Sequence, residues 1–118
     1  MTIEIAEQFE QQEDYEKAYD EYKRLLAKKP NNIDLLQRTA NVALILEKKD
    51  EASELLSKIL SLDPENIMCY EQLMDIYNDT DKYKYYIYRG DKHVIQGQIS
   101  HAINDFNKAL NKADSDEK

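Results

Sequence analysis

Two prolines, Pro30 and Pro64, stand 34 residues apart, and the residues that precede them match position by position. The matching pairs are Ala18 with Ala52, Tyr22 with Leu56, Leu26 with Leu60, and Asn32 with Asn66. A fixed period of this length is typical of stacked repeat proteins, in which each unit leaves an apolar face for its neighbour to cover. The chain is therefore expected to fold as an array of repeats.

Composition limits the class of protein and its partners. A chain of 118 residues is one domain's worth, and two glycines and two prolines leave little room for hairpins or flexible linkers. A net charge of −8 repels phosphate, so nucleic acid is not an expected partner. Neither a signal peptide nor a membrane-spanning apolar run stands out, and the lone Cys69 fits a reducing compartment. These features favour a cytoplasmic protein that contacts no membrane.

Apolar residues recur every three or four positions, which indicates helices. The spacing predicts seven helices, over residues 2–12, 15–28, 33–46, 51–61, 67–78, 82–95 and 99–112. Four polar residues stand where each could accept a hydrogen bond from the first turn of the next helix, namely Asp14, Asn32, Asp50 and Asn66. A turn is expected over residues 78–82, since Asn, Asp and Thr gather there.

The repeated residues resemble the tetratricopeptide repeat family, whose 34-residue unit is a pair of antiparallel helices. The positions that carry the resemblance are the small residues Ala6, Ala40, Ala18 and Ala52, the large apolar Tyr22 and Leu56, and the prolines Pro30 and Pro64. The resemblance implies an all-α solenoid of about seven antiparallel helices.

Strict periodicity fails after the second repeat, where Tyr86 and Gln98 stand in place of the expected Ala and Pro. In one reading, residues 67–82 are a half repeat before a full repeat over 83–116, which Gly90 and Phe106 support. In the favoured reading, repeats cover about 1–32, 33–66 and 67–96, and helix 99–112 caps the stack with a polar outer face. The domain is then residues 1–113, followed by a frayed tail over 114–118.

The first helix of each pair lines a peptide-binding groove in the family, and the resemblance places a mostly acidic wall there. The expected partner-binding residues are Glu7, Glu10, Arg38, Asn41, Glu71, Gln72 and Asp75. Some members clamp a peptide carboxylate with Lys, Asn and Arg, but those positions here hold Ile3, Glu7, Arg38, Met68 and Gln72. The expected ligand is therefore a basic or neutral peptide or protein segment.

Four tyrosines crowd the sixth predicted helix. Tyr83 and Tyr86 share its apolar side and are expected in the core. Tyr85 and Tyr88 share the other side, where they offer a possible interface, although partial burial is an equally simple role.

No grouping of residues suggests catalysis or a cofactor. His93 and His101 lie on different predicted helices without the further ligands that zinc needs, and Arg89-Gly90-Asp91 falls inside a helix, where the glycine fits a tight helix contact. The sequence therefore favours a protein-interaction module that is not an enzyme. The alternative is a self-associating or structural spacer domain, including a homo-oligomer.

Overall fold

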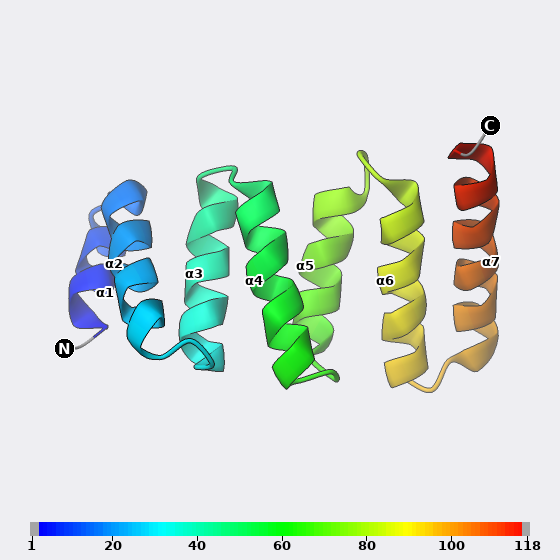
Figure 1. Cartoon of the computed structure of the whole chain (residues 1–118), viewed down its shortest axis with the longest axis horizontal. Helices are drawn as coiled ribbons and strands as arrows, with labels where there is room; N and C mark the ends of the chain where they lie inside the picture. The colour runs from blue at the N-terminus through cyan, green and yellow to red at the C-terminus, as the bar shows by residue number, and fades with distance from the viewer. Residues whose placement is uncertain (1–2, 117–118) are drawn as a thin grey trace. The chain divides into compact units, whose positions relative to one another are not determined.

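The computed structural model describes residues 3–116, and every regular element among them is an α-helix. Within each of two compact units, residues 1–64 and 65–118, consecutive helices run antiparallel and are joined by short turns (Figure 1). The helices are α1 (Glu4–Gln11), α2 (Tyr15–Lys28), α3 (Ile33–Ile45), α4 (Lys49–Leu62), α5 (Ile67–Tyr77), α6 (Lys82–Ile95) and α7 (Ile99–Asp116). The expected all-α fold of seven antiparallel helices is confirmed.

Most predicted boundaries agree with the structure to within a residue or two, and α2 and α6 match fully. The fourth helix begins at Lys49, ahead of the predicted residue 51. Helix α7 continues to Asp116, so residues 114–116 are helical although the sequence predicted a frayed tail there. Residues 1–2 and 117–118 lie outside the described part of the chain; residue 2 belongs to the first predicted helix, and residues 117–118 belong to that tail.

Three of the four expected helix caps are confirmed. Asp14, Asn32 and Asn66 each accept a hydrogen bond from the backbone N–H three residues later, at 3.4, 3.1 and 3.2 Å. The prediction for Asp50 is wrong, because α4 starts one position before it and the N-cap residue is Lys48, which makes no side-chain capping bond. Asp50 instead lies in the first helical turn, where a carboxylate still interacts favourably with the helix dipole.

The same backbone turn joins α1 to α2, α3 to α4, and α6 to α7. Glu13, Glu47 and Gly97 each have a positive φ, of 59°, 60° and 76°. The next residue in each turn donates its N–H to the carbonyl five positions earlier, at 2.8 Å in all three cases (to Phe9, Ala43 and His93). This is the Schellman ending of a helix. The first two turns stand 34 residues apart, and the third follows 50 residues after the second.

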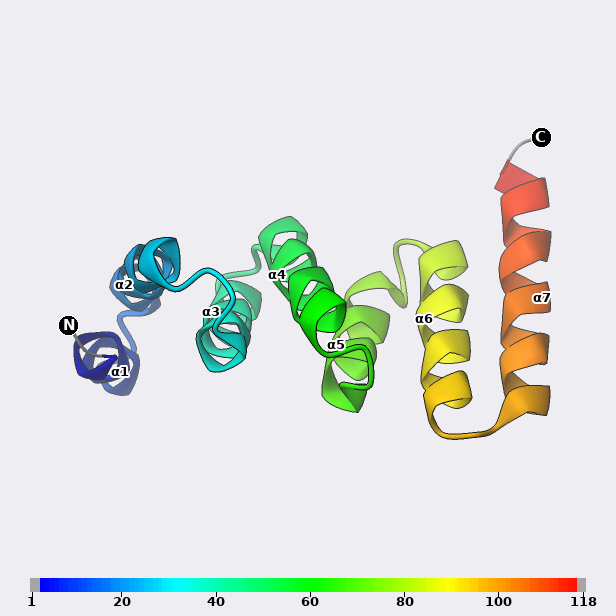
Figure 2. The same ribbon diagram turned by 60° about the horizontal axis from the view of Figure 1, so that its bottom comes forward.

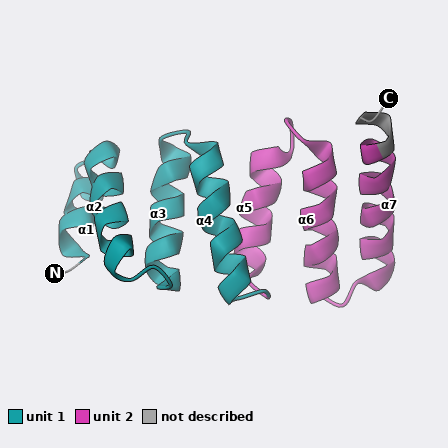
Figure 3. Ribbon diagram, viewed as in Figure 1, with its two compact units in different colours: residues 1–64 teal, residues 65–118 magenta. Residues whose placement is uncertain are grey.

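The chain divides into two compact units, residues 1–64 with α1–α4 and residues 65–118 with α5–α7 (Figure 3). In the first unit, α1 packs on α2, α2 on α3, and α3 on α4. The alanines at the repeat positions are fully buried, which lets the helices approach closely, and large side chains fill the remaining space. These buried residues are Ala6, Ala18, Ala40, Ala52, Tyr22, Leu36 and Leu56.

In the second unit, α6 packs between α5 and α7, and α6 and α7 lie side by side (Figure 2). Gly90 sits at a tight contact, as the sequence predicted, since a Cβ there would lie 2.5 Å from the ring of Phe106. Cys69 is fully buried as a small apolar residue. The expected polar outer face of α7 is wrong, because Ile99, Ile103 and Leu110 are all exposed.

Candidate functional site

Three of the predicted groove residues meet in the first unit. Glu7, Glu10 and Arg38, with Gln11, line a hollow of about 170 Å³ between α1 and α3. Arg38 donates from Nη1 to Glu7 at 3.1 Å and from Nε to Asp34 at 3.0 Å. The guanidinium is therefore held by its own neighbours, and its charge is already countered.

Tyr22 supports the cluster of Glu7, Glu10 and Arg38 through hydrogen bonds, a role that the sequence did not predict. Its side chain is fully buried in α2, and its hydroxyl donates a hydrogen bond to Glu10. Burial and then this bond raise the pKa of Tyr22 to about 12. The hydrogen bond between Tyr22 and Arg38 is the main cause that raises the pKa of Arg38, with Asp34 and Glu7 adding to it. The sequence feature that could have indicated this role is that Tyr22, which carries a hydroxyl, stands where the second repeat has the apolar Leu56.

The other predicted groove residues lie on α3 and α5. Asn41, on α3, is exposed and accepts a hydrogen bond from Gln37 at 3.0 Å. On α5, Glu71 pairs with Lys92 of α6 at 3.1 Å, Gln72 is half-buried, and Asp75 is exposed. Because α5 belongs to the second unit, its grouping with α1 and α3 into one groove stays a prediction.

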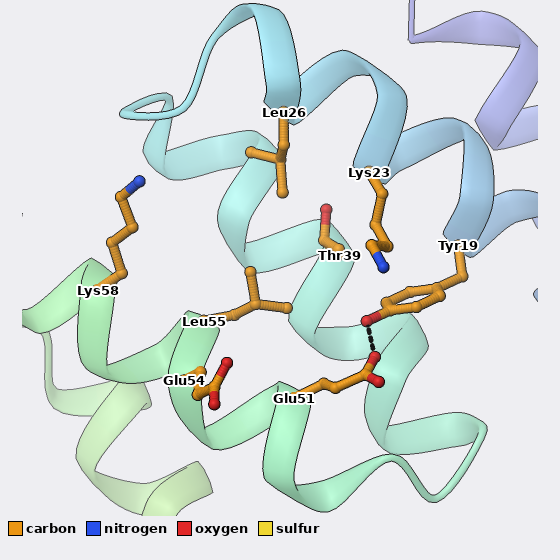
Figure 4. Close-up of a pocket in the computed structure, with 8 residues that line it drawn as sticks. All are labelled: Tyr19, Lys23, Leu26, Thr39, Glu51, Glu54, Leu55 and Lys58. Carbon is orange, nitrogen blue, oxygen red and sulfur yellow. Dashed lines mark hydrogen bonds between the residues drawn. The ribbon is translucent and has the colours of Figure 1, made fainter.

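A larger hollow of about 460 Å³ lies elsewhere in the first unit and contains none of the predicted groove residues. Figure 4 shows its lining side chains, which come mainly from α2 and α4. Two lysines and two glutamates surround Leu26 and Leu55, and the Tyr19 hydroxyl donates to Glu51. Burial, followed by that bond, raises the pKa of Tyr19 above its ordinary value. The lining is mixed in charge and holds no nucleophile paired with a base.

The tyrosines of α6 are arranged differently from the prediction. Tyr83 and Tyr86 were expected in the core, but 40% of the Tyr83 surface is exposed and Tyr86 is half-buried. Tyr88 stacks on Tyr77 of α5, with ring centroids 6.0 Å apart, and Tyr85 meets Tyr86 edge-on at 5.4 Å. The Arg89 guanidinium lies 5.3 and 5.2 Å from these last two rings. Tyr85 and Tyr88 are both half-buried, so their role as an interface stays a prediction.

The two histidines, treated separately in the sequence, meet in the second unit. Their ring centroids lie 5.4 Å apart, beside a hollow of about 330 Å³ between α6 and α7. His93 contacts the buried Asp105 through Nδ1 at 2.6 Å, and Arg89 donates to the same carboxylate at 2.7 and 2.9 Å. Burial opposes ionisation of Asp105, but these bonds together outweigh it and hold the pKa of the carboxyl below its ordinary range. The cluster of Arg89, His93 and Asp105 therefore links α6 to α7.

The described residues offer no metal site and no membrane helix. No group of three or more His, Cys, Asp or Glu side chains within residues 3–116 is arranged to hold a metal ion. Across that same part of the chain, no helix combines the length and apolar character that crossing a bilayer requires.

The sequence profile of the tetratricopeptide repeat matches residues 10–74, which is more than half of the chain. The chain belongs to the tetratricopeptide repeat family. Such domains generally act as protein–protein interaction modules and are typically non-catalytic scaffolds. A search of curated protein sequences gave no match.

Solved structures with the same fold include the first such domain of Spaghetti (RPAP3), bound to the HSP90 peptide SRMEEVD. It is 17% identical, with a TM-score of 0.66 over 92% of this chain and 86% of that one. MamA from Desulfovibrio magneticus RS-1 is 18% identical, with a TM-score of 0.59 over 98% and 76%. At this level of identity the likeness concerns the fold.

Proposed function

We propose that this domain binds a basic or neutral protein segment through the face formed by α1 and α3. The observation that supports this ligand is the local charge, since Glu7, Glu10 and Asp34 surround the single base Arg38. Three carboxylates against one guanidinium leave an excess of negative charge, which attracts and orients a cationic segment. Asn41, and on α5 Glu71, Gln72 and Asp75, are proposed as further contacts.

The same charges argue against an acidic ligand such as the HSP90 peptide bound by the Spaghetti domain. The positions of the family's carboxylate clamp hold Ile3, Glu7, Arg38, Met68 and Gln72. Glu7 would repel a peptide carboxylate, and Arg38 is already bonded to Glu7 and Asp34. A terminal carboxylate would therefore lie beside Arg38, whose charge is already paired, and beside Glu7, which repels it.

Peptide binding measured by fluorescence anisotropy tests this proposal. The peptide SRMEEVD should bind more weakly than the same peptide with its acidic residues replaced by lysine, and the lysine peptide should lose affinity as salt rises. The double variant Glu7→Lys with Asp75→Lys should bind the lysine peptide more weakly than the parent chain does at the same salt concentration. Glu16→Lys, on the exposed surface of α2, adds the same kind of charge away from this face and serves as the control.

If the double variant bound the lysine peptide as well as the parent does, the α1–α3 face would not be the site. A spacer domain without ligands, the alternative function, predicts that neither peptide binds at any salt concentration.

A further inference from the structure

The hollow between α6 and α7 has a counterpart in the first unit. The Schellman turns at Glu47 and Gly97 stand 50 residues apart, so α6 and α7 correspond to α3 and α4. Five side chains that line the hollow between α6 and α7 stand 50 residues after five that line the hollow of about 460 Å³ in the first unit. The pairs are Arg89 and Thr39, His101 and Glu51, Asn104 and Glu54, Asp105 and Leu55, and Lys108 and Lys58. The two hollows therefore lie at the same place on corresponding helix pairs.

A third helix closes one side of the hollow in the first unit. Helix α2 packs on α3 and contributes Tyr19, Lys23 and Leu26 to the lining (Figure 4). In the second unit the preceding helix is α5, which packs on α6 at another side, where Tyr77 stacks on Tyr88. Among the described residues, only side chains of α6 and α7 line the hollow there. The side that α2 closes in the first unit is therefore open in the second, because of where α5 packs.

The linings of the two hollows differ in charge. In the first unit, Glu51 and Glu54 of α4 share the hollow with Lys23 of α2. In the second unit, the positions of these two acids hold His101 and Asn104, which are both exposed. A helix that packed against α6 and α7 as α2 packs in the first unit would therefore be complementary if it carried an acid in place of Lys23.

Basic side chains outnumber acids around the open side. Asp105 is the one acid among the described side chains that line the hollow, and it is buried and bonded to Arg89 at 2.7 and 2.9 Å. Lys108 is exposed, with its ammonium group 5.7 Å from the centroid of the Tyr86 ring. Lys108 and Tyr86 also line a second hollow of about 280 Å³, to which α7 adds Lys112. These two hollows thus carry an excess of positive charge, on a chain whose net charge is −8.

We propose that the hollow between α6 and α7 binds an acidic helical segment of a partner protein, with the carboxylates of that segment beside His101 and Lys108. A helix is the expected form because α2 fills the corresponding place in the first unit. The site contains none of the residues proposed above to bind a basic segment, so it adds a second ligand of opposite charge.

Nucleic acid fits this hollow less well than an acidic protein segment does. Its affinity depends on neutralising several phosphates along the strand. The two hollows supply Lys108 and Lys112 as bases, together with Arg89, whose charge is already paired with Asp105.

A labelled synthetic peptide tests the proposal by fluorescence anisotropy. Its sequence is that of residues 15–28, which form α2, with glutamate in place of the four basic residues Lys17, Lys23, Arg24 and Lys28. The peptide keeps Tyr19 and Leu26, the side chains that α2 places in the hollow of the first unit. It should bind the whole chain although both molecules are acidic, and the affinity should fall as salt rises.

One lysine variant and its matched control locate the site. Lys108→Glu should weaken binding of the acidic peptide roughly tenfold or more. Lys84 is also an exposed lysine of the second unit beside a tyrosine ring, 4.9 Å from the centroid of Tyr77, but it lines neither hollow. Lys84→Glu should change the affinity by no more than about twofold at 0.15 M salt, since distant exposed charges are screened. Circular dichroism melts check that both variants keep the fold, as substitutions at exposed positions should allow.

The same peptide separates this site from the α1–α3 face. The double variant Glu7→Lys with Asp75→Lys should still bind the acidic peptide, whatever happens to its binding of the lysine peptide.

Three results would overturn the proposal. The parent chain could fail to bind the acidic peptide even at low salt. Lys108→Glu and Lys84→Glu could weaken binding equally, which would indicate diffuse attraction without a site. A single-stranded oligonucleotide could bind more tightly than the peptide and depend in the same way on Lys108, which would indicate a nucleic-acid site.

Discussion

Gly90 shows how one missing side chain sets the distance between two helices. A Cβ at this position would lie 2.5 to 2.8 Å from three atoms of the Phe106 ring. Gly90→Ala gains up to about 1 kcal/mol of helix propensity but forces the ring to move, and such overpacking costs roughly 1–3 kcal/mol. We expect the free energy of unfolding to fall, measured by urea denaturation. Adding Phe106→Leu should recover part of the loss; if the single variant is more stable than the parent, the contact is not tight.

Asp105 links stability to pH. Its pKa is held below the ordinary value in the folded chain by Arg89 and His93, which outweigh the effect of burial. The stabilisation is therefore present above about pH 4, the ordinary range for aspartate, and is lost as pH falls through the lowered native pKa. Asp105→Asn should lower the free energy of unfolding by about 1–3 kcal/mol at neutral pH, and this difference should shrink in acid. A difference that stayed constant with pH would contradict the role of the charge.

The helix starts differ in what caps them. Asn66 accepts a bond from the N–H of Cys69 at the start of α5, whereas Asp50 lies inside the first turn of α4 and does not act as its cap. Asn66→Ala should lower the free energy of unfolding by about 1 kcal/mol. Asp50→Ala should cost less, roughly 0.3–1 kcal/mol, since it removes only an interaction with the helix dipole. Equal losses for the two variants in thermal melts would contradict this difference.

The repeated turns predict where the helices of the array begin better than the helix sequences do. Lys48 occupies the place of Asp14, 34 residues earlier, and the two have nearly the same backbone conformation. The start of α4 could therefore have been predicted from the repeat itself. Asp50 was expected to cap α4 because of its residue type alone. The geometry of the preceding turn instead places Lys48 at the N-cap position.

At the scale of the whole molecule, the net charge of −8 opposes compaction. Most ion pairs in the described structure are partly exposed, such as Lys17–Asp14 and Arg38–Asp34, and exposed pairs contribute little. Screening should therefore relieve repulsion more than it weakens attraction, so the melting temperature should rise when salt increases from about 0.01 to 0.15 M. Thermal melts measure this; a lower melting temperature at high salt would show that ion pairs dominate.

The sequence by itself determined the helices, the family and most of the core, because the 34-residue period and the spacing of apolar residues are local and repeat. The resemblance to the family was enough to place Ala18 and Ala52 at helix contacts, and the position of Gly90 inside a predicted helix indicated a tight contact there. Only the tertiary structure decided that His93, Asp105 and Arg89 form one cluster, that Tyr22 supports Arg38, and that Tyr83 and the apolar stripe of Ile99, Ile103 and Leu110 on α7 are exposed. These features depend on which sides of neighbouring helices meet. Helical spacing shows that a face is apolar, but whether another helix covers that face depends on residues distant in the chain.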